Sequence, residues 1–193
     1  MKVGALLQTY NTLLKFSGMK LRPIVVVLIF YSIPLSGYAQ YTDEIGKSSQ
    51  ALIARADSLM ENFQFEKALS LLQQADSVDK EILLRLGQCN YRLGASGGAI
   101  GPFEQVLNLD SANATALNHL GQLYGRDGEF SKALSCFVKL IRLDSGNAYY
   151  FKQAGSMAMR LNQVHRAQQF YTQALRFNAR DTESSVALAN TFM

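Results

Sequence analysis

The chain has 193 residues, of which 48% are hydrophobic and 18% charged, and its formal net charge is +4. The basic excess lies at the N-terminus, because residues 1–39 contain Lys2, Lys15, Lys20 and Arg22 and no acidic residue. Subtracting these four from the 19 basic residues leaves 15, which balance the 15 acidic residues, so residues 40–193 are neutral. Nucleic-acid binding requires a basic patch or stripe, and this composition therefore disfavours a nucleic-acid partner.

The first feature along the chain is a pattern typical of a secretory signal peptide. Lys20 and Arg22 precede an apolar run from Ile24 to Ile33, and the small residues Gly37 and Ala39 follow at the spacing that a signal peptidase needs. The apolar run has about half of the roughly 20 residues that span a bilayer core. We therefore predict cleavage after Ala39.

This pattern predicts a signal peptide over residues 1–39, with Met19 rather than Met1 as the true start, and a linker over residues 40–48. The mature protein would then be exported, to the periplasm or cell envelope of a bacterium. The alternative is an uncleaved membrane anchor formed by residues 23–39, which would be the only contact with a membrane.

From about residue 49 onwards, residues of one kind recur at a spacing of 34. The repeated positions are Gly87, Gly121 and Gly155, continued by Ala189; Ala99, Ala133 and Ala167; and Phe103, Phe137 and Tyr171. A fixed period of this length indicates stacked structural units, each of which cannot bury its apolar face alone.

Each period predicts two helices. In the unit at 80–113, Leu83, Leu86, Gly87 and Asn90 follow the spacing of one helix face, and a second such face runs from Ala99 to Leu107. Close packing of two antiparallel helices requires small facing residues. We therefore expect Gly121 to face the region of Ala133, with the Phe137 ring beside it.

These residues resemble the tetratricopeptide repeat, whose period is about 34 and whose pattern runs Leu-Gly, Tyr, Ala, Phe, Pro. The unit at 114–147 matches best; the units at 80–113 and 148–181 keep most of the pattern, and the unit at about 49–79 is weaker. In that first unit the step from Ala68 to Ala99 is shorter than the repeat period, which predicts a tighter turn near positions 76–80. The terminal Pro of the pattern is missing throughout. The resemblance implies an all-α, right-handed solenoid.

The last segment, residues 182–193, predicts a first helix with Val186, Leu188, Ala189 and Phe192 on its apolar stripe. A lone capping helix should present a polar outer face, and this segment has few polar residues for one. We therefore expect a truncated unit, with a capping helix as the alternative. In the truncated case the array would be the N-terminal docking or sensory module of a longer enzyme or signalling protein.

No catalytic, metal or cofactor site is predicted. His119 and His165 have no ligand-type residue at helical spacing, and the glycines of residues 94–98 are predicted to form a turn between helices rather than a phosphate loop. Cys89 and Cys136 are predicted to be buried, unpaired apolar residues. Pro102 is expected in the first turns of its helix, where a missing N–H costs least.

The predicted function is therefore that of an exported, non-enzymatic scaffold that binds an unidentified protein or peptide. In the tetratricopeptide family the first helices line a concave groove. The resemblance places the following residues there: Gln88, Tyr91, Arg92, Asn118, Gln122, Arg126, Tyr149, Lys152, Ser156 and Arg160. Three of these are arginines that recur with the repeat period, and a row of arginines flanked by tyrosines suits an extended peptide that carries carboxylates. The alternative is that these arginines are only solvated.

Overall fold

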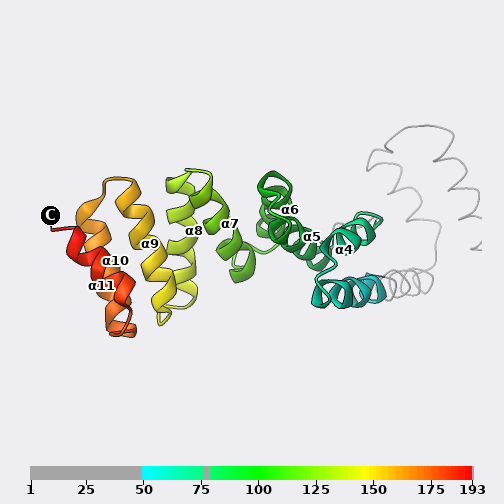
Figure 1. Cartoon of the computed structure of the whole chain (residues 1–193). Coiled ribbons are helices and arrows are strands. Elements are labelled where there is room, and N and C mark those ends of the chain that lie inside the picture. Colours follow the sequence, from blue (N-terminus) through cyan, green and yellow to red (C-terminus); the bar gives the residue numbers. More distant parts are fainter. Residues whose placement is uncertain (1–48, 76–78, 193) are drawn as a thin grey trace, which may run out of the picture. The chain divides into compact units, whose positions relative to one another are not determined.

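A computed structural model describes residues 49–75 and 79–192 (Figure 1). Residues Ser49–Met193 form one compact unit. The predicted signal peptide, the proposed start at Met19 and most of the predicted tight turn near 76–80 lie outside the described residues. No helix within the described ranges is both long and apolar enough to cross a membrane.

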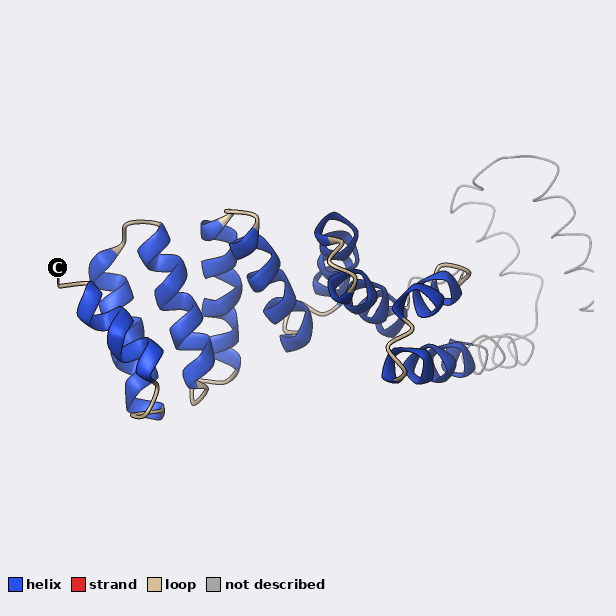
Figure 2. Cartoon of the chain, in the orientation of Figure 1, coloured by secondary structure: helices blue, strands red, loops and turns tan. Residues whose placement is uncertain are grey.

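The described residues form α-helices joined by short turns, with no strand among them (Figure 2). A helix at 49–61 is followed by α4 (Phe65–Leu72), α5 (Lys80–Arg92), α6 (Ser96–Leu109), α7 (Ala114–Arg126), α8 (Phe130–Leu143), α9 (Ala148–Arg160), α10 (Val164–Phe177) and α11 (Thr182–Asn190). Helices α5 and α6, α7 and α8, and α9 and α10 pack as pairs. The predicted all-α fold of stacked helix pairs is confirmed.

One small residue in each first helix allows the two helices of a pair to approach closely. In each pair the small residue is a glycine that lies against an aromatic ring of the second helix. If a Cβ atom were added to this glycine, it would lie 2.7 Å from the Phe103 ring at Gly87, 2.8 Å from the Phe137 ring at Gly121, and 2.7 Å from the Tyr171 ring at Gly155. Ordinary carbon–carbon contacts are about 3.5–4.0 Å. A larger side chain would push the helices apart. The predicted contact of Gly121 with the Phe137 ring is confirmed, whereas the glycine found opposite Ala133 is Gly125, whose added Cβ atom would lie 3.9 Å from that of Ala133.

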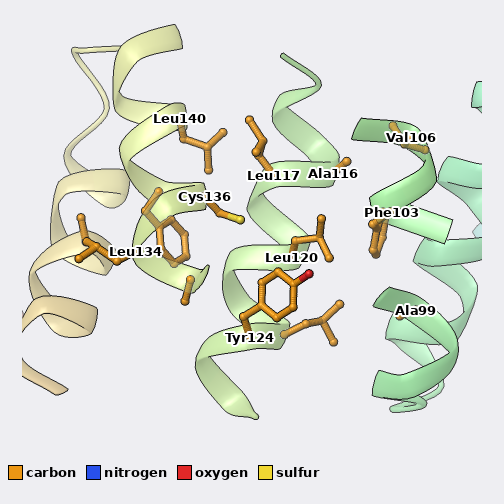
Figure 3. Packing of buried hydrophobic residues seen from close by; sticks show 14 of the residues in the cluster. Ala99, Phe103, Val106, Ala116, Leu117, Leu120, Tyr124, Leu134, Cys136 and Leu140 are labelled. Carbon is orange, nitrogen blue, oxygen red and sulfur yellow. The ribbon is translucent and has the colours of Figure 1, made fainter. Parts of the chain in front are cut away.

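The central core lies around α7, whose side chains fill the space between α6 and α8 (Figure 3). Leu117 and Leu120 of α7 are fully buried, as are Phe103 of α6 and Leu140 of α8. Packing of an amphipathic face against its neighbours supplies most of the stability of such helices. The order of the helices in the array is therefore fixed by contacts between sequence neighbours.

The first helices of three consecutive units share an N-terminal cap. The side chains of Asp79, Asn113 and Asn147 accept hydrogen bonds from the backbone N–H groups of Glu81 at 2.8 Å, Ala116 at 3.0 Å and Tyr149 at 3.1 Å, respectively. Such caps satisfy backbone donors that the helix itself leaves free. They explain why α5, α7 and α9 begin at equivalent positions.

The segment 94–98 differs from its prediction. Of these residues only Gly94 and Ala95 lie between α5 and α6, whereas Gly97 and Gly98 are already helical. Gly94 has φ +75°, in the left-handed region that favours glycine. A Cβ atom at Gly98 would lie 2.7 Å from the Asn90 side-chain oxygen, so this glycine allows a close contact between helices rather than a turn.

Because α6 begins at Ser96, Pro102 is the seventh residue of the helix, so the expectation that its missing N–H costs least is wrong. Pro102 lies inside the helix, beyond its first turn. A proline there removes a backbone hydrogen bond to the carbonyl four residues earlier and crowds that carbonyl. Glycine has a low helix propensity, and the glycines before Pro102 therefore led to a predicted helix start later than Ser96.

The apolar stripe predicted for α11 is only partly correct. Leu188 packs with Ala187 against the cluster around Tyr171, and Ser184 is fully buried. Val186 and Phe192, by contrast, are 60% and 75% exposed. The side of α11 that contacts α10 is therefore rotated relative to the stripe that periodicity predicts.

Candidate protein-binding face

The ten residues predicted to line a groove all lie on first helices. Helix α5 contains Gln88, Tyr91 and Arg92, helix α7 contains Asn118, Gln122 and Arg126, and helix α9 contains Tyr149, Lys152, Ser156 and Arg160. None of them is buried. We call this set the first-helix face.

Hydrogen bonds join three units across this face. The Tyr91 hydroxyl donates to the Gln122 side-chain oxygen, and the Gln122 amide nitrogen donates to the Tyr149 hydroxyl at 3.0 Å and to Asn118 Oδ1 at 3.3 Å. Gln122 thus links α5, α7 and α9. We call Tyr91, Gln122 and Tyr149 the central network.

The three arginines at the ends of the first helices lie on aromatic rings. The Arg92 guanidinium carbon is 5.3 Å from the centroid of the Phe65 ring, and that of Arg160 is 4.8 Å from the centroid of Phe130. Arg126 lies 5.9 Å from the Tyr91 centroid, and its Nη2 donates to Ser96 Oγ at 2.6 Å. Cation–π contacts within about 6 Å of the ring are attractive, so each guanidinium is held in place.

Lys152 has a different environment from the arginines. Its Nζ lies 2.6 Å from a Glu183 carboxylate oxygen and 3.4 Å from one of Asp181. The hydrogen bond to Glu183, aided by Asp181, raises the pKa of Lys152. Its charge is therefore already neutralised within the chain.

His119 lies beneath the face rather than on it. Its ring stacks on Phe103, with centroids 4.9 Å apart, and contacts the Tyr91 ring at 4.6 Å. Its Nδ1 atom is buried and has no hydrogen-bond partner among the described residues. Burial, followed by the charge of Arg92, lowers the pKa of His119. A neutral histidine therefore packs between the second and third units.

The structure extends the face onto α11, beyond the ten predicted residues. Glu183, Val186 and Asn190 stand one repeat period after Tyr149, Lys152 and Ser156. They line a shallow hollow of about 390 Å³ with Thr182 and Ala187. Applying the same period to the last segment would have identified these residues. A second hollow, of about 330 Å³, lies between helix 49–61 and α4, away from the ten predicted residues.

No metal-binding cluster and no thiolate at neutral pH is found among the described residues. Within 49–75 and 79–192 no group of three or more His, Cys, Asp or Glu side chains could hold a metal ion. Cys89 and Cys136 are buried and unpaired, as predicted. Burial raises the pKa of each thiol to about 11, so neither is a thiolate at neutral pH.

Comparison with known proteins agrees with this fold. Residues 114–147 match the family model described as tetratricopeptide repeat. No curated protein sequence matches the chain.

Among solved structures, a crystal structure of MamA protein is similar to this chain, with 19% sequence identity and a TM-score of 0.71. The matched region covers 76% of this chain and 82% of the MamA chain. MamA from Desulfovibrio magneticus RS-1 is 16% identical, with coverages of 74% and 82% and a TM-score of 0.68. At such low identity the likeness concerns the fold. The chain therefore carries a tetratricopeptide repeat at 114–147 within an array of helix pairs that shares the fold of MamA.

Proposed function

We propose that the array is a non-enzymatic scaffold that binds a protein or peptide along the first-helix face. The observation that carries this proposal is the central network, in which Gln122 joins three units into one polar surface. Tyr91 and Gln122 are half-buried and Tyr149 is 37% exposed, so this surface is ordered yet accessible. Stacked repeats present extended surfaces of this kind to their partners, and tyrosines provide rigid contact area.

Site-specific crosslinking in cells tests this proposal. A photoreactive amino acid at Asn118, on the face, should crosslink to a partner, whereas the same group at Lys139, an exposed residue of α8, should not. Gln122→Ala should weaken the crosslink from position 118, because it removes the two hydrogen bonds that join Gln122 to Tyr91 and Tyr149. Crosslinks of equal yield from Asn118 and Lys139, unchanged by Gln122→Ala, would show that the partner binds elsewhere.

We further propose that the scaffold acts outside the cytoplasm, with a mature chain that starts at Gln40. The support is the basic and apolar pattern of residues 20–39, which ends in Gly37 and Ala39. N-terminal sequencing of the protein from the cell envelope should give Gln40. A chain that starts at Met1 and stays in the cytosolic fraction would contradict the proposal.

A further inference from the structure

The charged residues near the first-helix face fall into two groups. In the first group the cation is neutralised within the chain. Arg85 on α5 donates from Nε and Nη2 to the two carboxylate oxygens of Asp57, at 2.6 and 2.9 Å, and from Nη1 to Glu81 at 2.7 Å. Lys152 is paired with Glu183 and Asp181. These contacts also occupy acidic residues that would otherwise repel an anionic partner.

Arg92, Arg126 and Arg160 form the second group. Each is exposed, and none forms an ion pair with a carboxylate in the described part of the chain. They occupy equivalent positions in consecutive units, as the last residues of α5, α7 and α9. The face therefore carries one positive charge per unit over three consecutive units.

The contacts of these arginines leave their hydrogen-bonding edges available. Phe65, Tyr91 and Phe130 lie against the guanidinium groups. A ring that packs on a guanidinium face does not consume N–H donors, of which arginine has five in one plane. Only Arg126 uses a donor toward another described side chain, that of Ser96. A guanidinium group that is held in position by a ring can bind a carboxylate through two parallel N–H···O hydrogen bonds.

From this arrangement we infer that the partner is an acidic polypeptide segment that lies in an extended conformation across α5, α7 and α9, with its carboxylates on Arg92, Arg126 and Arg160. This inference rests on the proposed function of the face. Neighbouring packed helices are about 10 Å apart, so the three arginines span at least roughly 20 Å. An extended strand rises about 3.3 Å per residue, and the segment therefore needs at least about six residues.

The central network favours the same kind of partner. The Tyr91 hydroxyl donates to Gln122, whereas the Tyr149 hydroxyl accepts from Gln122 and keeps its own proton free to donate. The Asn118 side-chain oxygen is likewise occupied by Gln122, which leaves the Asn118 amide N–H groups as donors for a ligand. The centre of the face thus presents donors, and backbone carbonyls and carboxylates supply acceptors.

A fluorescein-labelled peptide of twelve glutamates is a direct probe, with a peptide of twelve glutamines as its neutral counterpart. At low salt, fluorescence anisotropy should show binding of the glutamate peptide, and affinity should fall as salt is raised. Arg126→Glu should weaken binding at least about tenfold. Lys139→Glu, the same charge change on α8, should leave the affinity unchanged. Circular dichroism of both variants checks that they are folded.

Two results would overturn the inference. One is equal affinity of wild type and folded Arg126→Glu for the glutamate peptide, and the other is equal binding of the glutamine and glutamate peptides. The Asn118 crosslink separates this inference from the proposed function. A crosslinked partner that persists in Arg126→Glu would refute the acidic segment and leave the face in place, whereas no crosslink in the wild type would refute the face itself.

Discussion

Helices α6 and α8 occupy equivalent places in consecutive units, yet they are built from very different residues. Both have 14 residues and bury an alanine and a phenylalanine against the preceding first helix. Where α8 has Ser131, Lys132, Ser135 and Cys136, however, α6 has Gly97, Gly98, Gly101 and Pro102. Glycine and proline are the poorest helix formers. Packing against α5 therefore maintains a helix that its local sequence disfavours.

Removing the buried phenylalanine ring from each helix tests whether this shared contact is equivalent in the two helices. Phe103→Ala and Phe137→Ala should each destabilise the array by about 3–5 kcal/mol, because each removes a fully buried ring that fills the space beside a glycine. Urea denaturation followed by circular dichroism measures both. A cost for Phe103→Ala below half of that for Phe137→Ala would mean that α6 is held by other contacts.

A smaller change of opposite sign tests the difference between the helices. Pro102→Ala should stabilise the array by about 2 kcal/mol, somewhat less than the roughly 3 kcal/mol of the propensity scale, because the half-buried proline ring loses contacts. Hydrogen exchange of the wild type should show α6 opening before α8, and Pro102→Ala should reduce that gap. Equal protection of residues 99–109 and 131–143 in the wild type would contradict the ranking.

Glycine substitutions should separate two roles of glycine in these units. Gly97→Ala should stabilise α6 by about 0.5–1 kcal/mol, because the position is helical and a Cβ atom there meets no other atom within 4 Å. Gly121→Ala should instead destabilise the array, because its Cβ atom would lie 2.8 Å from the Phe137 ring. Thermal denaturation of the two variants should therefore give shifts of opposite sign.

A weak pH dependence of stability is expected from the contact between the second and third units. His119 contacts Phe103 of α6, whereas the equivalent position in the next unit is Gln153, which does not titrate. The pKa of His119 in the folded chain is lowered from its ordinary value of 6.5. At acidic pH the unfolded chain therefore binds a proton at His119 more readily than the folded chain does. The stability that the neutral His119 contributes is fully present above pH 6.5 and is lost as the pH falls below this value.

His119→Phe keeps a ring between Phe103 and Tyr91 and removes the titration. Urea denaturation at neutral and at mildly acidic pH should show a larger loss of stability for the wild type than for His119→Phe. An equal loss in the two proteins would assign the acid sensitivity to other groups.

The fold class and several contacts inside each unit could be predicted from the amino-acid sequence. The repeat period and the two apolar stripes per unit predicted stacked helix pairs, because helical periodicity is a local property. The contact of Gly121 with Phe137 and the burial of Cys89 and Cys136 also followed, since both concern residues whose neighbours are set by the repeat.

Other features depend on contacts between units that no local pattern in the sequence predicts. Ser96 begins a helix despite the glycines that follow, because the burial of Ala99 and Phe103 outweighs a weak propensity. Lys152 is neutralised by Glu183, whereas Arg126 lies on the ring of Tyr91. The charge available to a partner thus depends on which side chains from adjacent units meet, and that depends on how the helices stack rather than on spacing along the chain.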